Sequence, residues 1–323
     1  MMHDGDLEVV VRQIRSETSE VRSFVLESAS GEPLPEFRAG AHIDVFPIPG
    51  LSRQYSLVND PVDSSHYMLG VKREPNSRGG SSAMHGNLQE GSRLRISRPK
   101  NNFSLRENKG RNILLAGGIG VTPLLSMSQA LFRRGADFQL HYFVRSNSEM
   151  AFRDLIIGSE WSNRVTHHFG LIPPLLNDVL EEILRAPGTD DFIYLCGPGP
   201  FMDVVRSCAA NAGWNPGQIV LEHFSTEPPK LEAGADEFVV RLARRGIELI
   251  VPSDKSIIEV LREAGIEIQT SCEQGVCGTC VTPVLEGELL HNDLYLSDEE
   301  HEEGRLMTLC VSRCKSKLLV IDI

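Results

Sequence analysis

Residues 271–280 read Ser271-Cys272-Glu273-Gln274-Gly275-Val276-Cys277-Gly278-Thr279-Cys280, so that three cysteines follow the spacing C-x4-C-x2-C. A fourth cysteine, Cys310, comes after 29 intervening residues. This spacing is typical of plant-type [2Fe–2S] clusters, which three thiolates on one tight loop and one distant thiolate hold together. Gly275 and Gly278 suit such a loop, because residues without a Cβ let backbone N–H groups turn toward the sulfurs. The stretch therefore predicts an iron–sulfur domain.

Two alternatives are open at these cysteines. A structural zinc site would prefer two short C-x2-C pairs, whereas here three ligands fall within nine residues and the fourth is remote. Cys314 lies four residues beyond Cys310 and offers a different fourth ligand. We expect a cluster rather than zinc, with Cys314 packed as a small side chain and with the metal ligands Cys272, Cys277, Cys280 and Cys310.

The residues around the cysteines predict a small β-grasp domain of the α+β class. Two alternating stretches, 237–242 and 248–251, have the pattern of strands. Residues 256–265 have the pattern of a short helix that ends at a glycine. We therefore expect a ferredoxin-like domain at 237–323, preceded at 226–236 by a linker that contains two prolines and a glycine.

Two glycine-rich turns follow apolar strands in the middle of the chain. Residues 111–116 have the pattern of a buried strand and run into Gly117-Gly118-Ile119-Gly120-Val121-Thr122-Pro123, after which an amphipathic helix begins. A second apolar strand, 191–195, ends in Cys196-Gly197-Pro198-Gly199-Pro200-Phe201-Met202. Open α/β sheets bind ligands at the carboxyl ends of their strands, and the free N–H groups of a helix N-terminus attract phosphate. An ordinary connection between strand and helix is the alternative.

These turns belong to a predicted nicotinamide domain at 107–225. A strand pattern at 138–144 alternates with helix patterns at 149–157 and 179–184. Alternation of this kind predicts an α/β domain built on a parallel sheet.

The first 106 residues predict an antiparallel β-barrel. Short alternating stretches separated by turn residues lie at 7–14, 22–26, 42–46, 67–71 and 93–96. Between them, Arg53-Gln54-Tyr55-Ser56-Leu57 would place a ring and a hydroxyl beside a flat ligand. Lys72-Arg73 and Arg78-Gly79-Gly80-Ser81-Ser82 offer positive charge and close-approach glycines to a phosphate. The alternatives are exposed strand residues and an ordinary loop.

The overall composition is that of a soluble globular protein. Of the 323 residues, 44 are acidic and 32 basic, so no basic surplus exists to meet the phosphates of a nucleic acid. No apolar run approaches the roughly 18 residues that span a bilayer, and the first residues are polar and acidic, unlike a signal peptide. We expect a cytoplasmic protein without membrane contact, in which thiols stay reduced. The histidines, including His167 and His168, are expected to be surface or packed residues rather than ligands.

The three segments, in this order, resemble the phthalate dioxygenase reductase family, which includes the reductase subunits of vanillate demethylase and carnitine monooxygenase. The resemblance extends over essentially the whole chain. It implies an FMN barrel at 1–106, a nicotinamide domain at 107–225 and a C-terminal [2Fe–2S] ferredoxin domain. The flavin motif and phosphate loop would correspond to Arg53, Tyr55, Ser56, Lys72, Arg78, Gly79, Gly80 and Ser81.

The resemblance also assigns the nicotinamide site and its contacts with the flavin. Tyr55 would lie along the isoalloxazine, Ser56 near its reactive edge, Cys196 near the nicotinamide, and Phe224 would cover the flavin. Thr122 would touch the flavin as well. The glycine turns supply Gly117, Gly118, Gly120, Thr122, Pro123, Cys196, Gly197, Pro198, Phe201 and Met202.

Arg145 departs from the usual pattern of an NAD-specific fold, in which an acidic residue often ends the second strand. An arginine there would favour the extra phosphate of NADPH, or it would line the adenosine site of NADH. We expect NADH.

The function that this resemblance implies is the transfer of electrons from NADH through FMN and the cluster to a terminal Rieske-type oxygenase of aromatic or quaternary-amine catabolism. A flavin is needed because NADH gives up two electrons as a hydride, whereas the cluster takes one. No nucleophile or general base is required. The alternatives are an FAD-containing, ferredoxin-fused reductase of another oxygenase, and a redox sensor or electron-transfer subunit without its own nicotinamide turnover.

Overall fold

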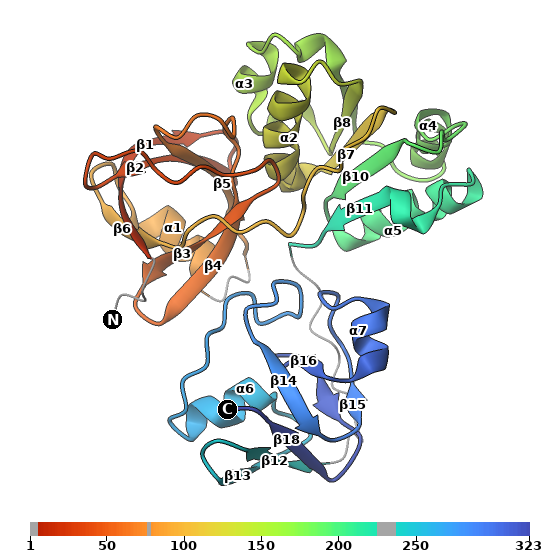
Figure 1. Cartoon of the computed structure of the whole chain (residues 1–323). Helices are drawn as coiled ribbons and strands as arrows, with labels where there is room; N and C mark the ends of the chain where they lie inside the picture. The colour runs from red at the N-terminus through yellow and green to blue at the C-terminus, as the bar shows by residue number, and fades with distance from the viewer. Residues whose placement is uncertain (1–5, 76–78, 225–236) are drawn as a thin grey trace. The chain divides into compact units, whose positions relative to one another are not determined.

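The computed structural model describes residues 6–75, 79–224 and 237–323. The chain forms two compact units, Met1–Phe224 and Ser225–Ile323 (Figure 1). The predicted linker at 226–236 lies outside the described residues. Among the helices in the described ranges, none combines the length and the apolar character needed to cross a bilayer.

The first part of unit one is a nearly closed antiparallel barrel. Its sheet has the order β4-β3-β6-β1-β2-β5. Leu57, which follows β4, bridges Leu69 of β5, so the two edge strands of the sheet meet. The interior is filled by apolar residues that alternate along the strands, such as Val9 and Val11. The strands are β1 (Leu7–Ser16), β2 (Val21–Ser28), β3 (His42–Ile48), β4 (Leu51–Ser56), β5 (Tyr67–Lys72) and β6 (Arg93–Ile96).

The barrel contains two elements that its sequence pattern does not predict. Strand β4 lacks an alternating apolar pattern, because most of its side chains are half-buried polar groups. Helix α1 (Gly80–Asn87) falls where we expected a loop, and its serines, glycines and asparagine are poor helix formers. The helix is held by tertiary contacts, since it buries Ala83 and Met84 against the barrel.

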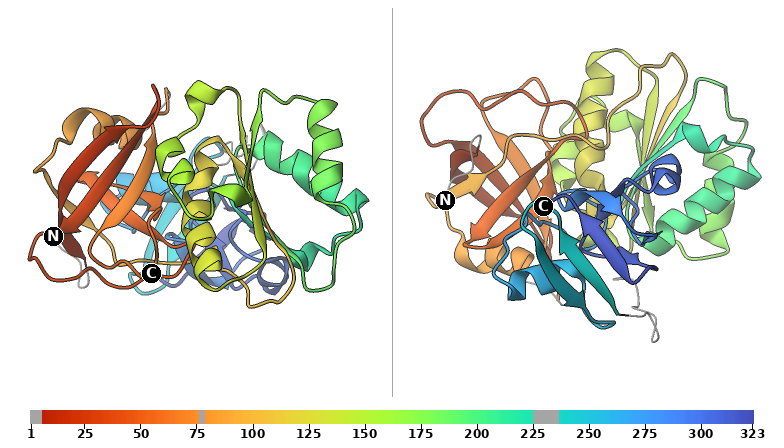
Figure 2. Two further views of the ribbon diagram at one scale, coloured as in Figure 1. Left: turned by 90° about the horizontal axis from the view of Figure 1, so that it is seen from above. Right: turned by 60° about the horizontal axis from the view of Figure 1, so that its bottom comes forward.

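The second part of unit one is a parallel sheet of order β11-β10-β7-β8-β9. Helix α2 packs on one face of this sheet, and α4 and α5 pack on the other (Figure 2). The strands are β7 (Asn112–Gly117), β8 (Phe138–Val144), β9 (Val165–Phe169), β10 (Phe192–Cys196) and β11 (Ile219–Glu222). The helices are α2 (Val121–Arg133), α3 (Arg153–Ile157), α4 (Leu175–Ile183) and α5 (Gly199–Asn211).

The prediction of one continuous helix at 149–157 is wrong in its length. Only α3 is an α-helix there, and a separate 3₁₀ turn spans Asn147–Glu149. Phe152, directly before α3, has a φ of 59°, and this left-handed conformation breaks the helical run. Its buried ring packs in the core of unit one, and its amide donates to Glu17 Oε2 of the barrel at 3.0 Å.

The barrel and the parallel sheet share one hydrophobic core. Val21 and Val58 of the barrel pack in the same cluster as Leu124 and Met127 of α2. Gln129 of α2 also donates to the carbonyl of Val58 at 2.8 Å. The boundary at 106/107 between a flavin and a nicotinamide domain therefore stays a prediction within one packed unit.

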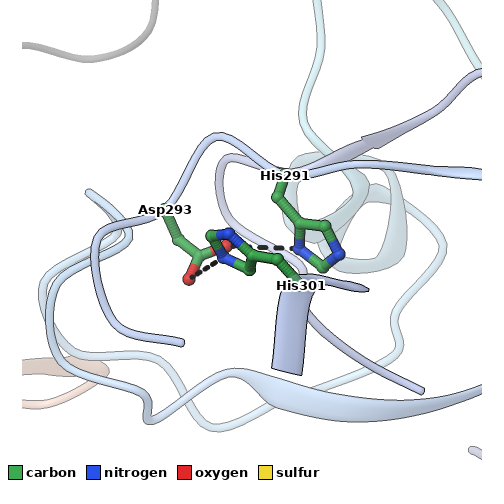
Figure 3. Close-up of side chains that lie close together, drawn as sticks. All are labelled: His291, Asp293 and His301. Atoms are coloured by element: carbon green, nitrogen blue, oxygen red, sulfur yellow. Dashed lines mark ion pairs between the residues drawn. The ribbon is translucent and has the colours of Figure 1, made fainter. Parts of the chain in front are cut away.

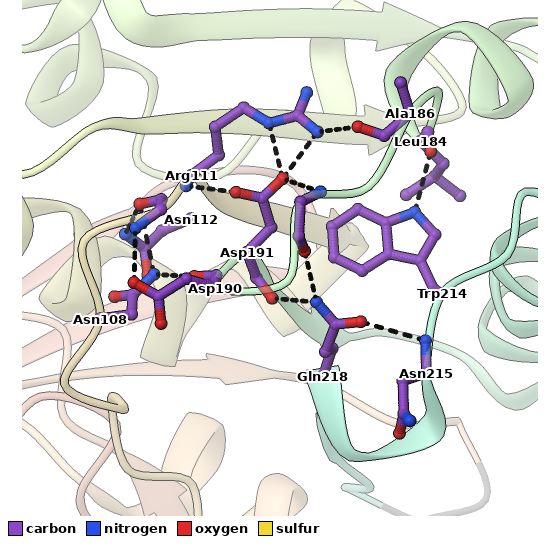
Figure 4. A network of polar contacts seen from close by, with 12 residues as sticks. Asn108, Arg111, Asn112, Leu184, Ala186, Asp190, Asp191, Trp214, Asn215 and Gln218 are labelled. Carbon is purple, nitrogen blue, oxygen red and sulfur yellow. Dashed lines mark hydrogen bonds and ion pairs between the residues drawn. The ribbon is translucent and has the colours of Figure 1, made fainter.

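A polar network centred on Asp191 joins the segments that lead into β7 and β10 (Figure 4). Oδ1 of Asp191 accepts from the Arg111 amide at 2.7 Å, and Oδ2 lies 2.7 Å from the Arg111 guanidinium. The amide of Gly188 donates to the same carboxylate at 2.8 Å. Burial would raise the pKa of Asp191, but these donors outweigh it and hold the pKa below its usual value.

We expect Asp191→Asn to lower the free energy of unfolding of unit one by about 3 kcal/mol at pH 7, because the Asp191 side chain is only 7% exposed and its loss leaves Arg111 unpaired. Because the pKa of Asp191 is lowered in the folded state, its ionised carboxylate stabilises the fold at pH values above the usual carboxyl pKa. The difference in free energy of unfolding between the variant and the wild type therefore shrinks as the pH falls through the folded-state pKa. Urea unfolding followed by tryptophan fluorescence measures the free energy of unfolding at each pH. Asp154→Asn, which breaks an exposed pair with Arg15, is the control and should have little effect. Equal effects of both variants would contradict this account.

Unit two is the predicted β-grasp domain, in which β12 and β18 run parallel in the middle of a sheet of order β13-β12-β18-β14-β16. Strands β15 and β17 form a separate pair. The acidic run at 298–303 forms helix α7 and is capped by Ser297. The strands are β12 (Phe238–Leu242), β13 (Ile247–Val251), β14 (Val281–Glu286), β15 (Leu289–Leu290), β16 (Leu306–Thr308), β17 (Arg313–Cys314) and β18 (Leu318–Ile321). The helices are α6 (Ile257–Glu263) and α7 (Asp298–Glu303).

Candidate functional site

The four expected metal ligands gather on one side of unit two. Cys272, Cys277 and Cys280 are buried on the loop between α6 and β14, and Cys310 follows β16. The Cys272 thiol donates to the sulfur of Cys277 and lowers the pKa of Cys277 to about 6, despite burial. Contact with Cys310 likewise lowers the pKa of Cys280. The same contacts raise the pKa of the donors Cys272 and Cys310, so it is the close approach of the four sulfurs that suits cluster ligation.

Backbone N–H groups point at these sulfurs, as the loop glycines led us to expect. The amide of Gln274 donates to Sγ of Cys272 at 3.3 Å. The amide of Gly275 reaches the sulfur of Cys310, and that of Thr279 reaches the sulfur of Cys277. Four clustered sulfurs surrounded by N–H donors are the environment that [2Fe–2S] clusters need, so the residues fit this group.

The two glycines of the loop are needed for its shape. Gly275 and Gly278 have φ values of 73° and 71°, in the left-handed region that favours glycine. A Cβ at Gly275 would lie 2.6 Å from the Val311 side chain, and one at Gly278 would overlap the Tyr295 ring. A side chain at Gly275 would push the loop away from the segment that carries Cys310, and one at Gly278 would push it away from Tyr295.

Cys314 is placed differently from Cys310. Its sulfur lies 3.0 Å from the Ser316 hydroxyl and 3.6 Å from the Leu318 carbonyl, and its side chain is buried in the hydrophobic core of unit two. Cys310, in contrast, interacts with Cys280 and Cys272. The geometry favours Cys310 as the fourth ligand, and its role stays a proposal.

In unit one, the two glycine-rich turns pack directly against each other at the carboxyl ends of β7 and β10. A Cβ at Gly117 would lie 2.8 Å from the Phe201 ring, and one at Gly197 would lie 2.9 Å from Gly117 Cα. A Cβ at Gly120 would overlap the carbonyl oxygen of Cys196. The turns thus form one surface at the position where parallel sheets bind ligands.

A polar cluster lies where this surface meets the barrel. Ser56, at the end of β4, donates to Oε2 of Glu222, at the end of β11, over 3.4 Å. Cys196, at the end of β10, is buried, and burial together with Glu222 raises the pKa of its thiol well above its usual value. The structure therefore brings together Ser56 and Cys196, which were expected beside the flavin and the nicotinamide. Glu222 was missed, because the sequence shows it only as a single carboxylate that ends an apolar strand.

Burial raises the pKa of Glu222 to about 8. In the unfolded chain the carboxyl titrates near its ordinary value of 4.5, so between these two pH values unfolding releases a proton and the fold loses stability as the pH rises. We expect Glu222→Gln to unfold at a higher temperature than the wild type at pH 9. At pH 9 the free energy of unfolding of the variant should exceed that of the wild type by on the order of 3 kcal/mol, after allowance for the partial exposure of the Glu222 side chain. This difference should vanish near pH 4.

Thermal unfolding followed by circular dichroism between pH 4 and 9 measures this difference. Glu181→Gln, at an exposed position on α4, serves as the control and should match the wild type throughout. A loss of stability in Glu222→Gln that is the same at every pH would contradict the assignment.

The expected flavin residues of the barrel fit a planar phosphate-bearing group. Arg53 lies beside Tyr55 and against the first turn of α1, where a Cβ at Gly80 would overlap its side chain. The first turn of α1 contains no acidic residue, and Gly79 precedes it with a φ of 93°. Among the described residues, a cation and a helix N-terminus without a side-chain cap therefore meet at one place, as phosphate binding requires. Ser81 accepts a hydrogen bond from the Glu74 amide and fixes the approach to this helix.

The other expected site residues make fewer contacts that point to a cofactor. Lys72 lies 3.4 Å from Glu74 and 3.9 Å from Glu20, so its charge is already paired. Thr122 is buried at the start of α2 and packs near Gly70 of β5. Arg145 is exposed at the end of β8. Arg78 lies outside the described residues. The expected residues not discussed elsewhere are Gly118 and Pro123 at the α2 turn, Pro198 and Met202 at the α5 turn, and Phe224, which is 38% exposed.

Comparison with known proteins finds a family match and full-length relatives. Residues 240–315 match the family described as a 2Fe-2S iron-sulfur cluster binding domain. The chain is 41% identical over 317 residues to the vanillate O-demethylase oxidoreductase of Pseudomonas sp. (strain HR199 / DSM 7063), covering 98% of this chain and 100% of that protein. It is 40% identical to a phthalate 4,5-dioxygenase reductase subunit of Pseudomonas putida, covering 93% and 91%. It is also 38% identical to the carnitine monooxygenase reductase subunit of Escherichia coli (strain K12), covering 98% of each.

Solved structures give the same result. Phthalate dioxygenase reductase, described as a modular structure for electron transfer from pyridine nucleotides to [2Fe–2S], superposes with a TM-score of 0.75 and 36% identity, covering 99% of this chain and 98% of that one. An intact type IV self-sufficient cytochrome P450 monooxygenase superposes with a TM-score of 0.84 and 33% identity. This chain covers only 41% of that longer protein.

Proposed function

The chain belongs to the phthalate dioxygenase reductase family of modular flavin and [2Fe–2S] oxidoreductases, the reductase components of oxygenase systems, and from this membership we propose that it carries electrons from NADH to a separate Rieske-type oxygenase. The predicted fold class, three architectures on one chain, is confirmed. The observation that carries the proposal is the gathering of four buried or half-buried cysteine sulfurs on unit two of a chain whose unit one joins a barrel to a nicotinamide-type sheet.

When bound, the flavin would accept a hydride from the nicotinamide, and the cluster would take electrons one at a time. Thiolates of Cys272, Cys277, Cys280 and Cys310 would hold the cluster, and the amides that point at them would stabilise its negative charge. Arg53 and the N-terminus of α1 would bind the flavin phosphate. The two glycine turns of unit one contact each other. Because glycine has no side chain, they would let the nicotinamide approach the backbone of the turns closely.

Ser56, Cys196 and Glu222 line the meeting point of the barrel and the sheet. The thiol of Cys196 stays protonated because burial and Glu222 raise its pKa, so it serves as an uncharged packing surface and not as a nucleophile. Glu222, whose pKa is about 8, holds its proton at neutral pH and can donate it in a hydrogen bond. We propose that this cluster orients the nicotinamide and keeps anionic charge away from it.

Within this assignment, FMN is preferred to FAD because the Arg53–Gly80 region suits a terminal phosphate. NADH is preferred to NADPH, and Arg145 would line the adenosine site. None of the seven cysteines, all of which lie in the described ranges, forms a disulfide, which suits a reducing compartment such as the cytoplasm. The oxygenase partner is proposed to act on a small organic substrate, since the relatives are named for vanillate, phthalate and carnitine.

Steady-state reduction of cytochrome c, a one-electron acceptor, by the purified chain tests this function. We expect fast reduction with NADH, slower reduction with NADPH, and FMN as the flavin released by heat. Slow reduction with both nucleotides, from protein that contains flavin and cluster, would instead support a redox sensor or an electron-transfer subunit. Release of FAD would overturn the FMN assignment alone.

A further inference from the structure

Two histidines and one aspartate form a compact cluster in unit two, apart from the four expected cluster ligands (Figure 3). His291 and Asp293 follow β15, and His301 lies on α7. One ligand atom of each side chain lies within 4.8 Å of the other two. Nδ1 of His291 is 3.6 Å from Oδ1 of Asp293, and Nε2 of His301 is 3.4 Å from Oδ2. The two histidines thus approach different oxygens of one carboxylate.

The carboxylate of Asp293 is fully buried and held in one orientation. Its side chain is 0% exposed. Oδ2 accepts from the Leu296 amide at 2.9 Å, and Oδ1 accepts from the Ser312 hydroxyl at 3.2 Å. Burial would raise the pKa of Asp293, but the Leu296 amide and His301 outweigh it and lower the pKa. An ionised carboxylate oriented by neighbouring donors is typical of metal ligands.

Apart from their ion pairs with Asp293, the buried ring nitrogens of the histidines make no hydrogen bonds among the described residues. The side chain of His291 is only 10% exposed, and neither of its ring nitrogens has a hydrogen-bond partner among the described residues. Nε2 of His301 is also buried and has no such partner within the described part of the chain. A buried polar atom left without a partner costs roughly 1–3 kcal/mol. In native structures such atoms call for a bound group, and an ion is one of the groups that satisfies them.

We propose that His291, Asp293 and His301 bind one divalent transition-metal ion of the zinc class, with water as the fourth ligand. Two imidazoles and one carboxylate favour such an ion over calcium or magnesium, which prefer oxygen ligands. Bonds of about 2.0–2.1 Å in a tetrahedral site place ligand atoms roughly 3.3 Å apart, and the three ligand atoms here lie within 4.8 Å of one another, so they must draw closer to bind one ion. The rings are stacked at 4.2 Å with an interplanar angle of 19°, so one must turn to direct its lone pair at the ion. His301, whose side chain is 26% exposed, has room to do so.

The contacts around Asp293 indicate the structural role that the ion would have. The residue after it, Leu294, donates its amide to the carbonyl of Gly275 at 3.0 Å, within the cysteine loop. Ser312, which donates to Asp293, lies two residues after Cys310. The proposed ion would therefore connect α7 to Asp293, whose carboxylate accepts from the segment that carries Cys310 and whose chain neighbour Leu294 bonds to the cysteine loop. It would stabilise the surroundings of the cluster without being part of it.

Equilibrium dialysis of the full-length holoprotein against micromolar Zn²⁺, with zinc and iron measured together, tests the proposal. We expect one zinc per chain to bind while the iron content and the visible bands of the cluster stay unchanged. His301→Asn should weaken this binding by at least about tenfold, as changes around metal sites generally do. His66→Asn is the matched control, because His66 forms a similar pair with Asp63 at 3.3 Å but belongs to no group of three possible ligands in the part of the chain that the structure describes. It should bind zinc like the wild type.

Two further readouts separate the outcomes. Zinc should raise the unfolding temperature of the wild-type holoprotein and of His66→Asn, but not of His301→Asn. Because His301 is partly exposed on α7, its variant should keep the cluster bands, which report that unit two is folded. Undetectable zinc binding, equal binding by His301→Asn, or zinc uptake matched by iron loss would each overturn the proposal, the last by placing zinc at the cysteines.

Discussion

Replacing Cys310 by alanine should remove the visible bands of the [2Fe–2S] cluster and its iron, while the flavin stays bound and is still reduced by NADH. The reason is the geometry of unit two, in which the Cys310 sulfur interacts with Cys280 and Cys272 and is the one thiol from outside the 272–280 loop that does so. Three thiolates from the loop alone leave the cluster open on one side. Reduction of cytochrome c by NADH should fall to the level of the flavin alone. Metal analysis and stopped-flow spectroscopy of the same preparation measure both effects.

Cys314→Ala is the control for this experiment. Its sulfur contacts Ser316 and Leu318 in the core, so the variant should keep cluster and activity and lose only some stability. Loss of the cluster in Cys314→Ala together with its retention in Cys310→Ala would show that Cys314 is the ligand. Such a result would reverse our assignment of the remote ligand.

The second large effect is expected at Gly120. A Cβ there would overlap the Cys196 carbonyl oxygen and lie 2.8 Å from the Gly197 nitrogen, and these backbone atoms cannot move aside without separating the two glycine turns. We expect Gly120→Ala to lower kcat/KM for NADH on the order of 100-fold, because small displacements of a reacting group cost rate factors of that size. Flavin and cluster bands should persist, since neither site includes this turn's contact with Cys196.

Gly217→Ala is the matched control in the same sheet domain. Its Cβ would meet only Asn215 Oδ1, at an ordinary 3.4 Å, and we expect unchanged kinetics. If Gly120→Ala kept the wild-type kcat/KM with its cofactors bound, the glycine turns would not form the nicotinamide site.

The features that could be predicted from the sequence are those whose partners lie close together along the chain. The cysteine loop and the glycine turns are local patterns, and each is required by backbone conformation or close approach. Glu222 could not be predicted, because it is meaningful only beside Ser56, which comes from a different sheet and lies 166 positions away.

Tertiary packing also decided the elements that the sequence did not reveal. Helix α1 is made of poor helix formers and is fixed by burial of Ala83 and Met84. The residues of β4 are half-buried up to Tyr55, so their burial does not alternate along the strand. That the histidines are surface or packed residues stays a prediction, and the sequence pattern did not show that His291 and His301 both lie beside Asp293 (Figure 3).

The central claim is that one chain takes electrons from NADH and passes them singly to another protein. An anaerobic titration of the purified holoprotein with NADH, followed by visible absorption, tests it most directly. We predict that both the flavin bands and the cluster bands bleach as NADH is added, and that oxidised cytochrome c then restores them. Bands from both groups that NADH leaves unchanged, while dithionite bleaches them, would contradict the claim.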